Sequence, residues 1–355
     1  MSVQIINQLK NPEVRNLAWC LLSPSLISQS DTTMAVYSLP YPVKLALWLQ
    51  QLDDNPLPLM QWMAECNSTR IGLIFEHYWH FYWHNIDAIS GDTADKTPTH
   101  EFRHNVQIHR HGKTVGELDA VHYSGDDRQV HHQELAVKFY LGITPQLAPN
   151  YPFPTINSTT NNQVLPVNEE DNQEKFLWLG PNANDRLDIK LSQLEHKQLR
   201  RLDDQKHWQV LPKHWCFDRV VSSLIIKGRL FYPLGYQQST AISNEYRPET
   251  GTWMTLAQLN NGGLEQLQQR DTDLCHQYQI LSREQWFAPI HWADCDTAMT
   301  PVQLIDQAKV YFTHEQRPFL VAVMPAADEN EQPWAQPEIE RFFVVHNNWP
   351  DICLA

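Results

Sequence analysis

The sequence is poor in the features that mark several common classes of protein. Its six cysteines are scattered over 355 residues with no CxxC pair, which excludes the usual zinc-finger and iron–sulfur spacings and predicts a reducing compartment. No uncharged apolar run approaches the roughly 20 residues that a membrane helix needs. The N-terminus lacks a charged stretch followed by an apolar one, so no signal peptide is expected. We therefore expect a soluble, cytoplasmic protein.

Motifs of nucleotide-binding and hydrolytic enzymes are also missing. The chain has no GxGxxG, GxxxxGK[ST], GxSxG or HExxH pattern. Positive charge is scarce, because 27 Lys and Arg stand against 41 Asp and Glu, a net charge of −14. Proteins that coat nucleic acid are usually basic, since phosphate neutralisation supplies most of their affinity. The charge balance argues against a broad DNA-coating role but leaves room for a narrow basic site.

Apolar residues are plentiful, and their spacing predicts an α/β protein. With 42% apolar residues and 13 tryptophans the chain can fill a sizeable core. We predict a helical region over 1–67, a core over 68–235 and a smaller α+β region over 236–355. Within the core the pattern predicts, in order, a helix, three antiparallel strands, a helix and a strand. The predicted elements are helices near 12–22, 44–52, 68–84, 186–202 and 302–312, strands near 105–110, 114–123, 130–141, 220–232, 277–281, 319–324 and 341–345, and a surface loop over 144–172.

The segment HHQELAVKFYL at 131–141 carries charges inside a strand pattern. Side chains alternate between the two faces of a strand, so Glu134 and Lys138 share one face and the apolar residues, beginning with Leu135, share the other. Asp119 lies on the preceding strand and can approach Glu134. Two converging carboxylates beside a lysine suit a hard cation such as Mg²⁺. The alternative is a solvated strand face with a cross-strand charge pair stabilising by under about 1 kcal/mol.

Glu76 is the third candidate carboxylate. Helical spacing places it on the stripe of Leu73, Trp79, His80 and Trp83, among aromatic residues rather than on a polar face. A carboxylate there needs a partner or a metal. The alternative is a glutamate at the edge of the stripe that reaches water.

The order helix with Glu76, strand, strand with Asp119, strand with Glu134 and Lys138, helix, strand resembles the core of the PD-(D/E)XK (restriction-endonuclease-like) nuclease superfamily. Nearly the whole chain also resembles a bacterial family catalogued as domain of unknown function 1853. That resemblance is carried by RNLAWCLLSPSL, RIGLIFE, GELD, ELAVKFYL, WLGPNANDRLDIKL and RFFVVHNNWP.

The superfamily resemblance implies a set of site residues. It implies that Asp119 and Glu134 hold Mg²⁺ or Mn²⁺ with help from the Leu135 carbonyl, that Glu76 holds a second ion or its water, and that Lys138 orients the nucleophile. The superfamily motif has acid and lysine two residues apart, whereas here they are four apart, about 13 Å instead of about 7 Å along a strand. Ala136 occupies the expected position.

A competing motif with the two-residue spacing is Asp188-x-Lys190. We rank it lower because RLDIK reads as the start of a helix, where Asp185 or Asp188 is better explained by capping and the helix dipole. The predicted helix has its leucines inward, at Leu187, Leu191, Leu194 and Leu202.

The same helix carries candidate nucleic-acid contacts. Lys190, Lys197 and Arg201 fall on one face and could receive phosphates, and Gln198 resembles a glutamine that some superfamily members carry. A solvated helix face is the plain alternative. His77, His80 and His84 could bind a transition metal, but they lack a carboxylate or thiolate at a defined spacing.

Together these patterns predict a Mg²⁺- or Mn²⁺-dependent nuclease that hydrolyses phosphodiester bonds in DNA or RNA. The alternatives are a catalytically inactive protein of the same fold that binds nucleic acid or protein, and an interaction protein with no such site.

Overall fold

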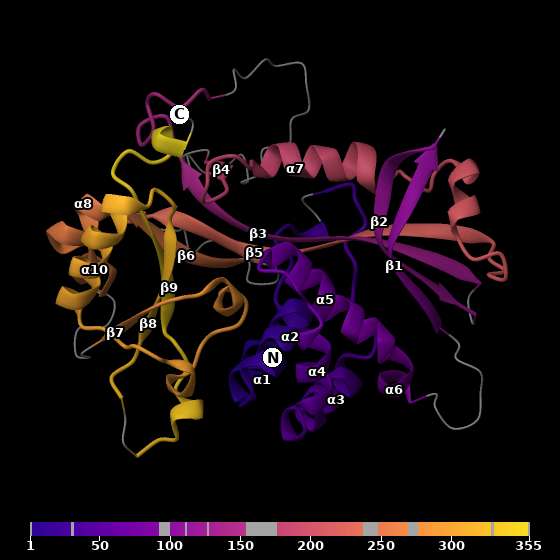
Figure 1. Ribbon diagram of the computed structural model, residues 1–355, viewed down its shortest axis with the longest axis horizontal. Coiled ribbons are helices and arrows are strands. Elements are labelled where there is room, and N and C mark those ends of the chain that lie inside the picture. Colours follow the sequence, from indigo (N-terminus) through magenta and orange to yellow (C-terminus); the bar gives the residue numbers. More distant parts are fainter. Residues whose placement is uncertain are drawn as a thin grey trace. The chain divides into compact units, whose positions relative to one another are not determined.

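The computed structural model describes residues 2–29, 32–91, 100–110, 112–125, 128–153, 176–236, 248–268, 276–327 and 330–353. Within these residues the chain is a mixed α/β protein with ten α-helices and nine strands. The strands pair in the order β1-β2-β3-β5-β6-β9-β8-β7, and the short β4 pairs with β3 (Figure 1). No helix of the described residues is long and apolar enough to cross a membrane.

The chain divides into two compact units. The first contains residues 1–5, 13–137 and 191–227, and the second contains residues 6–12, 138–190 and 228–355. Strands β3 (Gln129–Ile143) and β5 (Arg219–Pro233) each run from one unit into the other. The predicted division into 1–67, 68–235 and 236–355 remains a prediction.

The first unit contains five consecutive helices, of which the first, second and fourth were predicted. These are α2 (Pro12–Leu22), α3 (Pro42–Asp54), α4 (Leu57–Ala64), α5 (Ile71–His84) and α6 (Ile86–Ser90). The apolar side of α2 is wholly buried, and Pro42 begins α3, where its missing N–H costs no hydrogen bond. Helix α4 was not predicted, because its short sequence LPLMQWMA contains a proline and lacks a clear polar face.

Three antiparallel strands follow these helices, as predicted. Strand β1 (His100–Arg110) pairs with β2 (Lys113–Ser124), and β2 pairs with β3 over Ala120–Ser124 and Gln129–Gln133. Their apolar side chains, including Leu118, Val121 and Val130, pack on residues 202–215. After them come α7 (Leu187–Gln193), a π-helical turn (Leu194–Gln198), a 3₁₀ turn (Gln205–Val210) and β5. The order of the predicted core elements is therefore observed.

Strand β3 is mostly buried on both faces, which contradicts the alternative of a solvated strand face. Glu134 is fully buried, and so is His132 two residues earlier. The face of β3 that carries His132 and Glu134 is therefore covered by other residues of the protein, as the apolar face is. Solvated side chains cannot explain Glu134.

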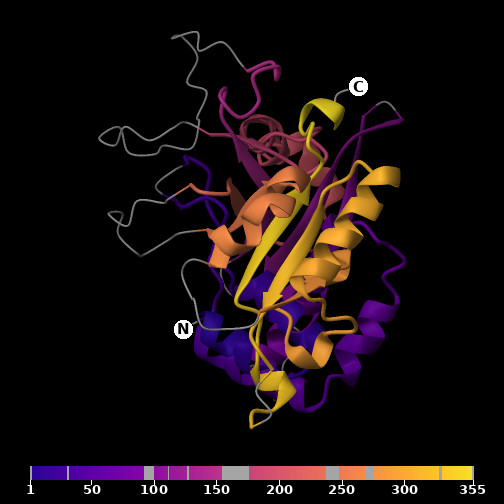
Figure 2. The ribbon, with the colours of Figure 1, turned by 90° about the vertical axis from the view of Figure 1, so that its left-hand side faces the viewer.

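The second unit is built on a mixed sheet. Strand β6 (Glu249–Thr255) is parallel to both β5 and β9 (Glu340–Val345), and β8 (Phe319–Met324) is antiparallel to β9 and to β7 (Gln277–Ile280). Helix α10 (Pro301–His314) lies along β8 and β9 (Figure 2) and buries Leu304, Ala308 and Phe312 against them. Strands β6 and the three-residue β4 (Leu177–Leu179) were not predicted, because both are short and β6 contains a glycine between threonines. Most of the predicted loop over 144–172 lies outside the described residues.

Candidate functional site

The carboxylate of Glu134 lies at the centre of a hydrogen-bonded network inside the first unit. Its Oε1 accepts from Arg201 Nη1 at 3.1 Å and lies 3.0 Å from Nε2 of His132, while its Oε2 accepts from Gln198 Nε2 at 2.7 Å. Glu134 and His132 are completely buried, whereas the Arg201 side chain is 23% exposed. Both carboxylate oxygens therefore have partners, and a guanidinium compensates the buried charge.

His132 occupies a defined orientation between two partners. Its Nδ1 lies 3.1 Å from the hydroxyl of Ser222 on β5, and its Nε2 faces Glu134. Nε2 can donate to the carboxylate, and Nδ1 can share a hydrogen bond with the serine hydroxyl, which can donate or accept. The alternation of strand side chains predicted that His132 and Glu134 share a face. The contact with Ser222 was not predicted, because it joins residues 90 positions apart.

The helix that follows β4 supplies the other two partners, and its π-helical turn decides which side chains point inward. The turn over Leu194–Gln198 contains one residue more per turn than an α-helix, with Leu199 N–H bonded to Leu194 O at 3.0 Å. Gln198 and Arg201 both reach Glu134, and Arg201 also donates to the Glu117 carbonyl. The predicted inward leucines are all buried, at Leu187, Leu191, Leu194 and Leu202.

This turn also separates the side chains that were predicted to form one basic face. Arg201 is engaged with Glu134, whereas Lys197 is exposed and Lys190 is half-buried. The predicted basic face assumed α-helical spacing from Lys190 to Arg201, and that spacing does not hold across the π-helical turn. Arg201 therefore contacts Glu134, which the prediction did not include. A nucleic-acid role for Lys190, Lys197, Arg201 and Gln198 remains a prediction.

Asp119 stands next to this network on β2. The ladder pairs Val121 with His132 and ends at the pair Ala120 and Gln133, and the same register continued by one residue brings Asp119 opposite Glu134. The side chain is half-buried, and its Oδ2 accepts from the backbone N–H of Leu135 at 2.9 Å. Asp119 therefore ties β2 to β3 just beyond the end of their backbone ladder, and its approach to the carboxylate of Glu134 remains a prediction.

Lys138 makes its contacts within the second unit. Its ammonium donates to Asp185 Oδ2 at 2.6 Å, and the hydroxyl of Tyr140 donates to the same oxygen at 3.3 Å. Burial, and then the charge of Asp185, raise the pKa of Tyr140 well above its usual range, so this hydroxyl stays protonated. Asp185 was expected to act at the helix start, and its pairing with Lys138 was missed because the two are 47 residues apart. Asp188 instead pairs with Arg186 at 2.5 Å.

Glu76 lies at the margin of the buried stripe on α5, which corrects the prediction that it sits among the aromatic residues. Leu73 on the same side is 42% exposed and Glu76 is half-buried, while Trp79, His80 and Trp83 are buried. Leu73 and Glu76 are therefore the members of the predicted stripe that are not buried, although Ile74 and Phe75 between them are buried. Its role as a metal ligand remains a prediction.

The histidines of α5 pack as aromatic rings. His80 is 3% exposed and stacks on His104 of β1, with ring centroids 4.3 Å apart. Its neighbour His77 stacks on Trp62 at 5.1 Å. Burial, and then the nearby His104, lower the pKa of His80 to about 3. His80 is therefore a neutral core residue at physiological pH.

This low pKa predicts a loss of stability in acid. The ordinary pKa of His80 is 6.5, so between pH 6.5 and 3 the unfolded state binds more protons and the free energy of unfolding falls as the pH is lowered. We expect the parent to lose about 1.4 kcal/mol more than His80→Phe between pH 7.5 and pH 5.5, measured by urea unfolding. If the parent and His80→Phe lost the same free energy of unfolding over this pH range, the low pKa of His80 would be contradicted.

These residues do not by themselves form a metal site. A Mg²⁺ ion shared by Asp119 and Glu134 would compete with three side-chain donors for the oxygens of Glu134. Across the part of the chain that the structure describes, no group of three or more His, Cys, Asp or Glu residues is placed to hold a metal ion. The arrangement as bonded here is better suited to holding β2, β3 and the following helix together than to coordinating Mg²⁺ or Mn²⁺.

Comparisons with known proteins give a family but no characterised relative. No curated protein and no solved structure matches the chain. One family model matches residues 15–151 and 164–345, which include Asp119, Glu134, Lys138 and the helix that carries Arg201. The chain therefore belongs to the family described as Domain of unknown function (DUF1853).

Proposed function

We propose that this chain is a nuclease-like protein that binds nucleic acid without cleaving it. The observation that carries the proposal is the state of Glu134, whose oxygens are bonded to Arg201, His132 and Gln198 in a fully buried position. Exchanging these bonds for a metal would leave the guanidinium without its partner. The resemblance to the PD-(D/E)XK core, and the observed order of elements from α5 to β5, support the nuclease-like part.

The charge of one segment of the first unit, residues 191–227, supports nucleic acid as the ligand. Residues 191–227 contain seven Lys and Arg against four Asp and Glu, although the whole chain carries a net charge of −14. Lys197 lies in the π-helical turn and Arg200 in the turn directly after it, and both side chains are exposed. Exposed cations on a rigid helix can contact phosphates, and such contacts make affinity fall as salt rises.

Binding is tested by fluorescence anisotropy with labelled single- and double-stranded DNA and RNA. We expect the double variant Lys197→Glu/Arg200→Glu to lose at least tenfold in affinity and to lower the salt slope by about two, since two phosphate contacts are removed. The matched control is Lys309→Glu/Arg317→Glu, which makes the same charge change at exposed positions of the second unit. Equal losses in both variants, or no binding by the parent, would contradict the proposal.

Mg²⁺- or Mn²⁺-dependent hydrolysis of DNA or RNA is the second candidate. It is favoured by the half-buried Asp119 opposite Glu134 and by the partial exposure of Arg201, whose departure would open Glu134. Asp119 and Glu134 would then hold the ion, with Glu76 and Lys138 in the supporting roles that the resemblance implies. The two candidate functions are separated by incubating the protein with the same nucleic acids and millimolar Mg²⁺ or Mn²⁺ and measuring cleavage. Cleavage that is lost in Asp119→Ala would establish hydrolysis and overturn the non-cleaving proposal.

A further inference from the structure

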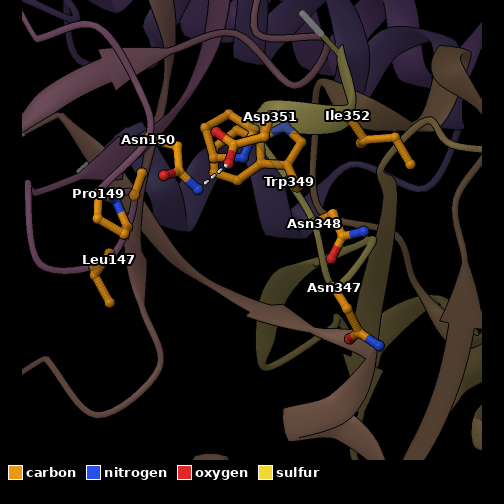
Figure 3. A pocket seen from close by; sticks show the side chains of 10 residues that line it. Leu147, Pro149, Asn150, Asn347, Asn348, Trp349, Asp351 and Ile352 are labelled. Atoms are coloured by element: carbon orange, nitrogen blue, oxygen red, sulfur yellow. Dashed lines mark hydrogen bonds between the residues drawn. The ribbon is translucent and has the colours of Figure 1, made fainter. Parts of the chain in front are cut away.

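The second unit contains a hollow of about 540 Å³, remote in sequence from the Glu134 network. It is walled by residues 147–150, just after β3, and by residues 347–352, just after β9 (Figure 3). The carboxyl ends of these strands lie at the same edge of the sheet, because the indole of Trp253 on β6 donates to Gly142 O at 3.0 Å and β6 is parallel to β9. In open α/β sheets that edge is the usual place for ligands.

The walls of the hollow are held in place by contacts outside it. The indole N–H of Trp349 donates to Pro181 O at 2.9 Å, and its ring packs edge-on against Trp253 with centroids 5.2 Å apart. Asn347 Oδ1 accepts from the backbone N–H of Ala257 at 2.7 Å. The lining is therefore positioned before any ligand arrives, which lowers the entropic cost of binding.

Asp351 gives the hollow its charge. Its Oδ2 accepts from Asn150 Nδ2 at 3.1 Å, and the two side chains meet in Figure 3. Its Oδ1 is buried, and no hydrogen-bond partner for it exists among the described residues. The ten residues that line the hollow include no Lys, Arg or His, so none of them balances this carboxylate. A buried acceptor without a donor destabilises the protein, and more so when the acceptor is charged.

The rest of the lining offers further hydrogen-bond acceptors for a cationic group and an apolar surface for its aliphatic chain. Asn150 still has a carboxamide oxygen after donating to Asp351, and Asn348 is exposed at the opposite wall. Leu147 and Pro149 supply an apolar side (Figure 3). An inorganic cation would need several more oxygen ligands, and an anion would be repelled by Asp351.

We propose that this hollow binds a small organic cation with N–H donors, a primary ammonium or guanidinium group on an aliphatic stem. The N–H group donates to the carboxylate of Asp351 and to the carboxamide oxygens, and the methylenes lie on Leu147 and Pro149. This site is independent of the nucleic-acid proposal, because it uses no residue of the first unit.

The test is calorimetric titration of the full chain with agmatine and with 1,4-diaminobutane. We expect saturable binding that weakens at least tenfold in Asp351→Asn, a variant that keeps an acceptor for Asn150 but removes the charge. Tetramethylammonium, which has the charge but no N–H, should bind at least tenfold more weakly than agmatine. The matched control is Asp306→Asn on helix α10, where the side chain of Asp306 is 68% exposed. This variant also removes one negative charge and should bind agmatine like the parent.

Circular dichroism and thermal unfolding will show whether Asp351→Asn is folded. If it is not, the exposed Asn348→Ala variant serves instead and should weaken agmatine binding about threefold or more, as expected for loss of one hydrogen bond to a charged group. No saturable binding up to 10 mM agmatine (about 2.7 kcal/mol of affinity), or equal binding by the parent, Asp351→Asn and Asp306→Asn, would overturn the proposal.

Discussion

An Arg201→Met protein should unfold with a free energy about 3 kcal/mol lower than that of the parent. Removing one partner of a buried ion pair typically costs about 3–5 kcal/mol, because the other charge stays buried without compensation. Arg201 is 23% exposed and Glu134 keeps its contacts with His132 and Gln198, which places the expected loss at the lower end. Urea unfolding at pH 7.5 measures the effect.

A double-mutant cycle separates the ion pair from other roles of the arginine. Glu134→Gln removes the charge of the acid, so Arg201→Met should cost at least about 1 kcal/mol less in that background than in the parent. The control is Arg200→Met at the exposed neighbouring position, where we expect a change within about 0.5 kcal/mol. Additive losses in the cycle would show that Arg201 stabilises the fold without depending on Glu134.

Gly228→Ala should prevent folding or lower the free energy of unfolding by more than about 4 kcal/mol. Gly228 lies on β5 at φ +150°, and a Cβ built there would stand 1.7 Å from the Lys138 carbonyl oxygen of β3. That oxygen belongs to the backbone of a central strand, so it cannot move aside as the end of a flexible side chain can. The yield of folded protein and its urea midpoint measure the effect.

Gly72→Ala is the matched control, because Gly72 lies in helix α5 with no atom within 4 Å of the added Cβ. Alanine is the better helix former, so this variant should be as stable as the parent or more stable by up to about 1 kcal/mol. A Gly228→Ala protein as stable as Gly72→Ala would contradict the close approach of β3 and β5.

Much of the fold follows from local sequence patterns. Seven of the described strands and the long helices were predicted to within a few residues, since apolar residues recur with the period of their own element. The antiparallel order of β1, β2 and β3 followed from two short connections, which leave neighbouring strands few alternatives. The helices and strands that were not predicted are all short, namely α1 (Ser2–Gln8), α4, α6, α8 (Leu256–Gln258), α9 (Leu264–Gln268), β4 and β6.

The candidate site was predicted less well, because its decisive contacts join residues far apart in sequence. The charges of HHQELAVKFYL and the position of Asp119 were visible as a pattern, and the register places Asp119 opposite Glu134. The pattern could not show that Glu134 is buried, because alternation reveals that two faces differ but not what covers each face.

By itself the sequence determined that this chain is a mixed α/β protein and that Glu134 lies on a face of β3 with other polar side chains. Only the tertiary structure decided the partners of those side chains, Arg201 and Gln198 for Glu134 and Asp185 for Lys138. The physical reason is that hydrogen bonds and ion pairs act over a few ångströms. Their partners are therefore set by how distant elements pack, and here also by one π-helical turn that changes which side chains face inward.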